Sequence, residues 1–219
     1  ELLISDNEQI ASSAFSILNE LPTNNNEKQL LTKPSNNWDD VFDFQHKNLL
    51  FYRIHAIGHF IENEEKIGDK LWISYFYDTG GATSLFNKTF NQEFNAKDDS
   101  KQFLILLDVC NLIISKIDEI DKIKLVLNEN TLTNIINQAL SISKSSRHAN
   151  VLWLLLSILE KFSAVDTSFV LNCELFYDLF NETIFSSNKS IRGLISMIAK
   201  RVFSKDAKKD LIDIIDRSV

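Results

Sequence analysis

The sequence predicts an all-helical protein. Glycine and proline are scarce, with five and two among 219 residues, whereas apolar residues recur at helical spacing over long segments. A chain of this length with 44% hydrophobic residues can bury a sizeable core. Scarce chain-breaking residues combined with long periodic segments favour helices over a many-stranded sheet.

The N-terminal third predicts a helix, a loop and a second helical segment. Residues 8–21 place apolar side chains at helical spacing, and Pro22 ends that pattern. Residues 23–37 (TNNNEKQLLTKPSNN) are rich in Asn and contain a proline, so we expect a flexible loop there. The helical pattern returns over residues 38–65. We therefore expect residues 1–37 to form an N-terminal helix with a flexible Asn-rich loop, and residues 38–219 to form one continuous domain.

A glycine pair stands at the centre of the next stretch. Gly80 and Gly81 separate a short aromatic helix at 71–77 from a helix whose apolar face spans 85–94. The pair lacks the Lys and Ser/Thr of a phosphate-binding loop and has no strand before it. We expect it to provide a sharp turn with positive φ between closely packed helices.

The remaining sequence continues the helical pattern. Residues 95–100 form a polar turn, and residues 103–117 are apolar nearly all round, which is typical of a buried central helix. Further helices are expected at 120–127, 132–140, 147–162, 169–185, 191–203 and 207–215.

Three segments share one plan of a helix, a turn and a strongly apolar helix. They pair residues 80–90 with 101–114, 130–140 with 147–162, and 173–185 with 190–203. The pairs Leu85-Phe86, Ile135-Ile136 and Leu179-Phe180 match one another, which gives a period of about 44 to 50 residues, close to that of HEAT and armadillo units. Each unit would bury one face against its own partner helix and another against the next unit.

The corner DTGGATSLFNKTF, followed by a turn and LLDVCNLI, resembles armadillo repeats. This resemblance implies a right-handed α-α superhelix of armadillo/HEAT-like repeats. It also implies a role for Asn111, which lies where armadillo units often place the Asn that holds the backbone of a bound peptide. Leu107 stands where nuclear-import carriers have an accompanying Trp, and Trp153 is followed by Ser157 instead of Asn. An import-carrier function is therefore not expected.

A second resemblance concerns the stretch WISYFYDTGGATSLFNKTF. It is similar to units in the long helical regions that flank the catalytic domain of very large ubiquitin-specific proteases. The resemblance implies that the chain is a regulatory repeat region of such a protease. Nothing in the sequence matches the catalytic Cys or His motifs of those enzymes.

The net charge limits the classes of binding partner that we expect, and the cysteine content indicates the cellular compartment. The formal net charge of −7 argues against nucleic acid or an anionic membrane as a partner, because both require a basic face. The apolar run at 151–159 is shorter than the roughly 20 residues that span a bilayer. Cys110 and Cys173 lie within helical patterns, which indicates a reducing setting, the cytoplasm or alternatively the nucleus. The chain begins at Glu1 without a methionine, so we expect a monomeric fragment of a longer protein.

His55 and His59 are the only candidate metal ligands at a suitable spacing. They lie four residues apart on a helix, which would allow two imidazoles to share a metal ion. A zinc-protease motif requires Glu directly after the first His, but Ala56 occupies that position, and only Glu62 is a further candidate ligand. We expect no metal and no cofactor; a small metal-dependent enzyme domain that uses this helix is the alternative.

Polar residues gather where two core helices begin. Arg147, His148 and Asn150 open one of them and Arg192 opens another. Stacked repeats would align such positions along one inner surface, which would suit an acidic or extended peptide segment. With no catalytic constellation in the sequence, we expect a non-catalytic protein-protein interaction scaffold. The partner-binding residues would be Asn111, Arg147, His148, Asn150 and Arg192.

Overall fold

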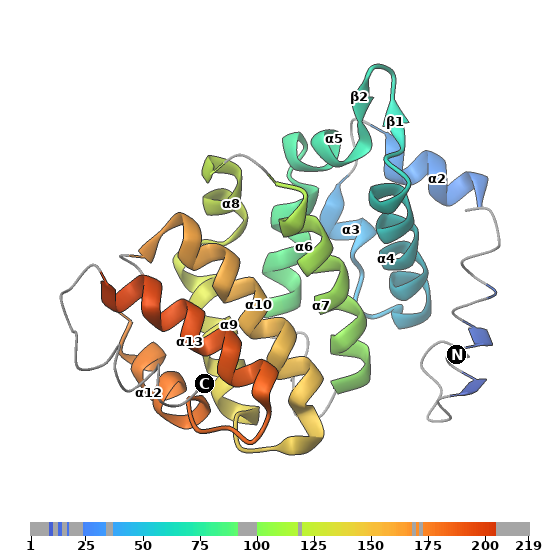
Figure 1. The fold of residues 1–219 in the computed structure, drawn as a ribbon. Coiled ribbons are helices and arrows are strands. Elements are labelled where there is room, and N and C mark those ends of the chain that lie inside the picture. The colour runs from blue at the N-terminus through green and yellow to red at the C-terminus, as the bar shows by residue number, and fades with distance from the viewer. Residues whose placement is uncertain are drawn as a thin grey trace. The chain divides into compact units, whose positions relative to one another are not determined.

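The computed structural model describes residues 9–10, 13–14, 17, 24–33, 37–91, 100–117, 120–167, 170 and 173–204 (Figure 1). These residues form eleven α-helices with almost no strand, which confirms the all-α prediction. The expected helices at 8–21 and 207–215 and the turn at 95–100 lie wholly or largely outside the described residues.

The helices are α2 (Asn25–Thr32), α3 (Trp38–Val41), α4 (Lys47–Glu62), α5 (Trp72–Asp78), α6 (Gly81–Phe90), α7 (Ser100–Ser115), α8 (Ile120–Val126), α9 (Glu129–Ile142), α10 (Ala149–Val165), α12 (Glu174–Thr183) and α13 (Lys189–Ser204). A 3-10 turn, η2 (Ser146–His148), precedes α10. Two short strands, β1 (Lys66–Ile67) and β2 (Lys70–Leu71), pair antiparallel.

The chain divides into two compact units, residues 1–88 and 89–219. This division falls near the end of α6 and does not coincide with the boundary at residue 37 that the sequence suggested. The grouping of residues 38–219 into one repeat domain stays a prediction.

The first unit corrects the expectation of a flexible loop over residues 23–37, because α2 lies within that segment. The side chain of Asn24 caps the helix by accepting a hydrogen bond from the Asn26 amide. Leu31 is completely buried, and its carbonyl accepts a hydrogen bond from Nε1 of Trp72 at 3.1 Å. Glu27 pairs with Arg53 of α4 at 2.7 Å. Capping and tertiary contacts therefore stabilise a helix that composition alone did not suggest.

The single helical segment expected at 38–65 is interrupted. α3 ends at Val41, and α4 begins at Lys47 after a turn in which Asp43 accepts a hydrogen bond from the Gln45 amide. After α4, Gly68 lies in the β1–β2 turn with φ of +60°. Local side-chain hydrogen bonding in the turn competes with helix continuation, which explains the break.

The structure confirms the structural interpretation of the glycine pair. Gly80 has φ of +81°, a region that side chains other than glycine rarely adopt. A Cβ atom on Gly81 would lie 2.3 Å from the Phe76 ring and 2.8 Å from the Trp38 ring. The chain therefore turns at Gly80, and α6 starts in direct contact with buried aromatic rings.

The second unit stacks helices in two layers. α7, α10 and α13 lie side by side, with α10 packed against both neighbours (Figure 1). α9 packs against α12, and these two helices also pack against α10 and α13 respectively. The apolar side chains of α10 are buried on nearly every side, as expected for a helix with neighbours on three sides.

Candidate interaction surface

The structure places the five sequence-predicted binding residues in different environments. Arg147 and Asn150 are exposed beside the start of α10. His148 is 7% exposed, and its Nδ1 has no hydrogen-bond partner among the described residues. Arg192 donates hydrogen bonds from Nη1 to the carbonyls of Ser186 and Ser187. Asn111 donates from Nδ2 to the carbonyl of Leu154. The amide of Asn111 and the guanidinium of Arg192 are therefore already hydrogen-bonded to backbone carbonyls of the chain itself.

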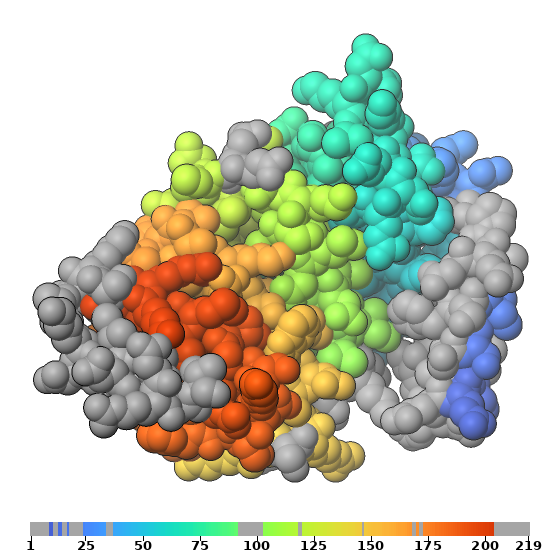
Figure 2. All heavy atoms as spheres, in the orientation of Figure 1, coloured from blue at the N-terminus to red at the C-terminus, as the bar shows by residue number. Residues whose placement is uncertain are grey.

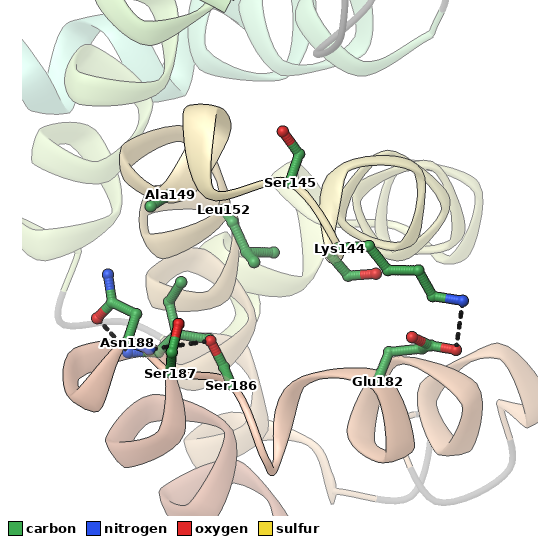
Figure 3. A pocket seen from close by; sticks show the side chains of 10 residues that line it. Lys144, Ser145, Ala149, Leu152, Glu182, Ser186, Ser187 and Asn188 are labelled. Atoms are coloured by element: carbon green, nitrogen blue, oxygen red, sulfur yellow. Dashed lines mark hydrogen bonds and ion pairs between the residues drawn. The ribbon is translucent and has the colours of Figure 1, made fainter.

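A pocket of about 540 Å³ lies close to the starts of α10 and α13 (Figure 3). Its lining comes from the turn before α10, the turn before α13, the first turns of both helices and Glu182 of α12. Lys144 forms an ion pair with Glu182 at 3.1 Å. Asn188 accepts hydrogen bonds from the amides of Ser190 and Ile191 and so caps α13. Several polar groups of the pocket are therefore engaged with one another.

A different surface emerges from the register of α7, α10 and α13. The hydrogen bond from Asn111 to the Leu154 carbonyl fixes α7 against α10. Arg201 fixes α13 against α10, because its Nη1 lies 2.9 Å from the Glu160 carbonyl and 2.5 Å from the Glu160 carboxylate. With this register, the sequence of buried and exposed positions along α10 recurs along α7 and α13.

We use the name α7–α10–α13 face for one set of equivalent positions on these helices, which are at least partly exposed except for the buried Ser157. It contains three rows of equivalent positions, each four residues after the previous one, so that the rows follow one side of every helix. The first row is Asp108, Trp153 and Gly193; the second is Leu112, Ser157 and Met197; the third is Lys116, Lys161 and Arg201.

Large apolar side chains stand exposed on this face. Trp153 is 42% exposed and Met197 is 46% exposed, although most other large apolar side chains of both helices are buried. A Cβ atom added at Gly193 would meet nothing within 4 Å, so the position equivalent to Trp153 on α13 is open. In the space-filling view, the surfaces of α7 and α13 border that of α10 (Figure 2). The face thus combines an exposed indole and thioether with an open neighbouring position.

Asp108 in the first row and Lys161 in the third row carry opposite charges on either side of the second row. Partial burial raises the pKa of the Asp108 carboxyl, and none of the residues that the structure describes forms a hydrogen bond or ion pair with that carboxyl. Partial burial also lowers the pKa of the Lys161 amine, which the neighbouring Glu160 carboxylate partly offsets. Each group is therefore a partly desolvated charge, a state that a bound opposite charge would relieve.

The alternative metal site gains no further ligand. Among the residues that the structure describes, no group of three or more His, Cys, Asp or Glu could hold a metal ion. His55 and His59 are partly buried on α4. Cys110 is completely buried, and burial raises the pKa of its thiol far above the usual range, so the reactive thiolate is suppressed.

No helix within the described ranges has the length and apolar character needed to cross a membrane. No protein-family model and no curated protein matches the sequence. The chemistry of the α7–α10–α13 face therefore rests on its own residues.

Proposed function

We propose that the chain is a non-catalytic protein-interaction scaffold whose α7–α10–α13 face binds an extended peptide segment of a partner protein. The observation that carries this proposal is the exposure of Trp153 and Met197 on neighbouring helices of one packed layer. Trp and Met are enriched at protein interfaces, and Trp is among the commonest residues to dominate binding energy. An exposed Trp on a rigid helix loses little conformational entropy when a ligand covers it.

The helix pairs of the second unit support an armadillo/HEAT-like arrangement, which we propose to be a right-handed superhelix. α10 packs against its partner helix α9, α13 packs against its partner helix α12, and α10 also packs against both α7 and α13, as stacked repeats require. Such stacking presents a preformed surface, because α10 is held on both flanks and from behind. The membership of a larger intracellular protein, and of a ubiquitin-specific protease in particular, stays a prediction from the sequence.

Peptide selection tests this function. Peptides selected from a displayed random library on the purified 219-residue chain should bind Trp153→Ala and Met197→Ala at least about tenfold more weakly. The loss is expected because each substitution removes an apolar anchor from the face. Affinity can be measured by fluorescence polarisation with each selected peptide.

Phe185→Ala is the matched control, since Phe185 is 74% exposed on the turn before α13 and lies outside the three rows. Its affinity for the selected peptides should equal that of the unsubstituted chain. The proposal fails if the library yields no binding peptide, or if Trp153→Ala and Met197→Ala bind the selected peptides as tightly as Phe185→Ala does.

A further inference from the structure

Opposite charges stand at the two ends of the α7–α10–α13 face. Asp108 occupies the first row beside Trp153, and Lys161 occupies the third row, with Lys116 at the equivalent position of α7. Leu112 and Met197 lie in the row between them, on either side of the small side chain of Ser157. The face therefore changes from acidic and aromatic, through apolar, to basic along the helix direction.

The spacing of these rows matches an extended peptide. Positions four residues apart on a helix are separated by about 6 Å along its axis. Side chains on one side of an extended strand recur every second residue, about 6.7 Å apart. A peptide lying along α10 would consequently present residues i, i+2 and i+4 to the three successive rows.

Each end of the face can recognise one kind of side chain. The indole ring of Trp153 offers a π surface to a Lys or Arg side chain, and the Asp108 carboxylate lies at the equivalent position of the neighbouring helix. A bound cation would not have to displace a partner of Asp108, because no residue in the described part of the chain pairs with that carboxylate. At the other end, the amine of Lys161 can pair with a carboxylate.

We infer that the face binds extended segments of the pattern basic–x–apolar–x–acidic. The basic side chain lies between Trp153 and Asp108, the apolar side chain covers Leu112, Ser157 and Met197, and the acidic side chain pairs with Lys161. This inference rests on the proposed function and adds the chemistry of the ligand. It runs against the net charge of −7, which by itself would favour a ligand with two basic ends.

Three synthetic peptides of equal length test the inference. They carry Lys-Ser-Leu-Ser-Glu, Lys-Ser-Leu-Ser-Lys and Glu-Ser-Leu-Ser-Glu between identical Gly-Ser flanks, each with one fluorescent label. The 219-residue chain should bind the Lys–Glu peptide about tenfold more tightly than either of the others. Equal binding of the Lys–Glu and Lys–Lys peptides, or no binding of the Lys–Glu peptide, would overturn the inference.

Charge-reversal variants separate recognition from misfolding. Lys161→Glu should transfer the preference to the Lys–Lys peptide, and Asp108→Lys should transfer it to the Glu–Glu peptide. An unfolded variant would lose all three peptides and could not reverse a preference. If the preference does not reverse in either variant, the assignment of the two ends is wrong. Peptides from the random library that still depend on Trp153 would then leave the proposed function standing.

Asp108→Asn provides a readout of stability alongside binding. Because the pKa of Asp108 is raised in the folded chain, its ionisation destabilises the fold, and that cost grows as pH rises through the folded pKa. The Asn variant should therefore have a higher Tm at pH 7, and this gain should vanish as pH falls toward the ordinary Asp value of 3.8. The same variant should bind the Lys–Glu peptide about tenfold more weakly. A lower Tm at pH 7 or unchanged affinity would contradict the role given to Asp108.

Discussion

Replacing Gly81 with alanine is expected to lower the free energy of unfolding of the first unit by about 3 kcal/mol. The added Cβ atom would lie 2.3 Å from the Phe76 ring, far inside van der Waals contact. It would also lie 2.8 Å from Cε2 of Trp38. The clash is with the rings themselves, so it cannot be relieved by moving the end of a flexible side chain.

The surrounding rings have little freedom to move. Phe76 stacks on Trp72 with ring centroids 4.8 Å apart and meets Trp38 edge-on at 4.9 Å. Trp38 is in turn held by a hydrogen bond from its Nε1 to the Thr79 hydroxyl at 3.1 Å. Displacing one ring consequently disturbs the others, and close-packed interiors transmit such strain.

Gly193→Ala is the matched control for Gly81→Ala. Gly193 lies inside α13, and its added Cβ would meet nothing within 4 Å. Alanine there should raise the free energy of unfolding by about 0.5–1 kcal/mol, because glycine has a larger entropy cost in a helix. Urea denaturation followed by circular dichroism gives both values. Equal effects of the two substitutions would contradict the packing described at the glycine corner.

The second large effect is expected for Trp72→Ala, which should lower the free energy of unfolding of the first unit by about 3–5 kcal/mol. Trp72 is 1% exposed, stacks on Phe76 and meets the Phe60 ring at 5.3 Å. Its indole N–H also satisfies the carbonyl of Leu31. The substitution would therefore remove a large buried side chain and leave a buried acceptor unpaired.

Two further variants separate the contribution of the hydrogen bond to Leu31 from that of the buried ring volume of Trp72. Trp72→Phe keeps most of the ring volume but loses the hydrogen bond to Leu31, so it should cost about 1–3 kcal/mol. It should also reduce the hydrogen-exchange protection of α2 more than that of α4, since Leu31 belongs to α2. Trp153→Ala makes the same chemical change as Trp72→Ala at a half-exposed site and should cost far less. A loss at Trp153 as large as that at Trp72 would contradict the assignment of Trp72 to the core.

The amino-acid pattern predicts the helices of the second unit well. The apolar periodicity at 103–117, 132–140, 147–162 and 191–203 corresponds to α7, α9, α10 and α13 within a few residues at each end. These helices are long and strongly apolar, and for such segments periodicity is most informative. The glycine corner was also predictable, because adjacent glycines between aromatic and apolar segments have few other structural uses.

α2 was not predictable in the same way. Its sequence NNEKQLLT is polar, and the contacts that stabilise it come from Arg53 and Trp72, which lie far along the chain. The break between α3 and α4 has a similar origin, because it depends on the local hydrogen bonds of Asp43. Tertiary contacts and turn chemistry override composition in both cases.

The α7–α10–α13 face could not be predicted from the sequence, for a different reason. Trp153 lies within the run VLWLLLSIL, whose residues are apolar on all sides, so periodicity cannot tell which of them faces solvent. Only the register of α7, α10 and α13 identifies the exposed positions. The sequence instead predicted binding residues among the polar side chains at helix starts. One of these, Arg192, donates hydrogen bonds to the carbonyls of Ser186 and Ser187 in the turn before α13.

The methyl group of Met197 allows a direct test of peptide binding at the α7–α10–α13 face. The chain contains one methionine, so ¹³C-methyl labelling of methionine gives one NMR signal from the middle row of the face. Titration with a selected peptide, or with the Lys–Glu peptide, should shift this signal in proportion to the bound fraction measured by fluorescence polarisation. A methyl signal that stays unshifted while the peptide saturates the chain would contradict binding at the α7–α10–α13 face.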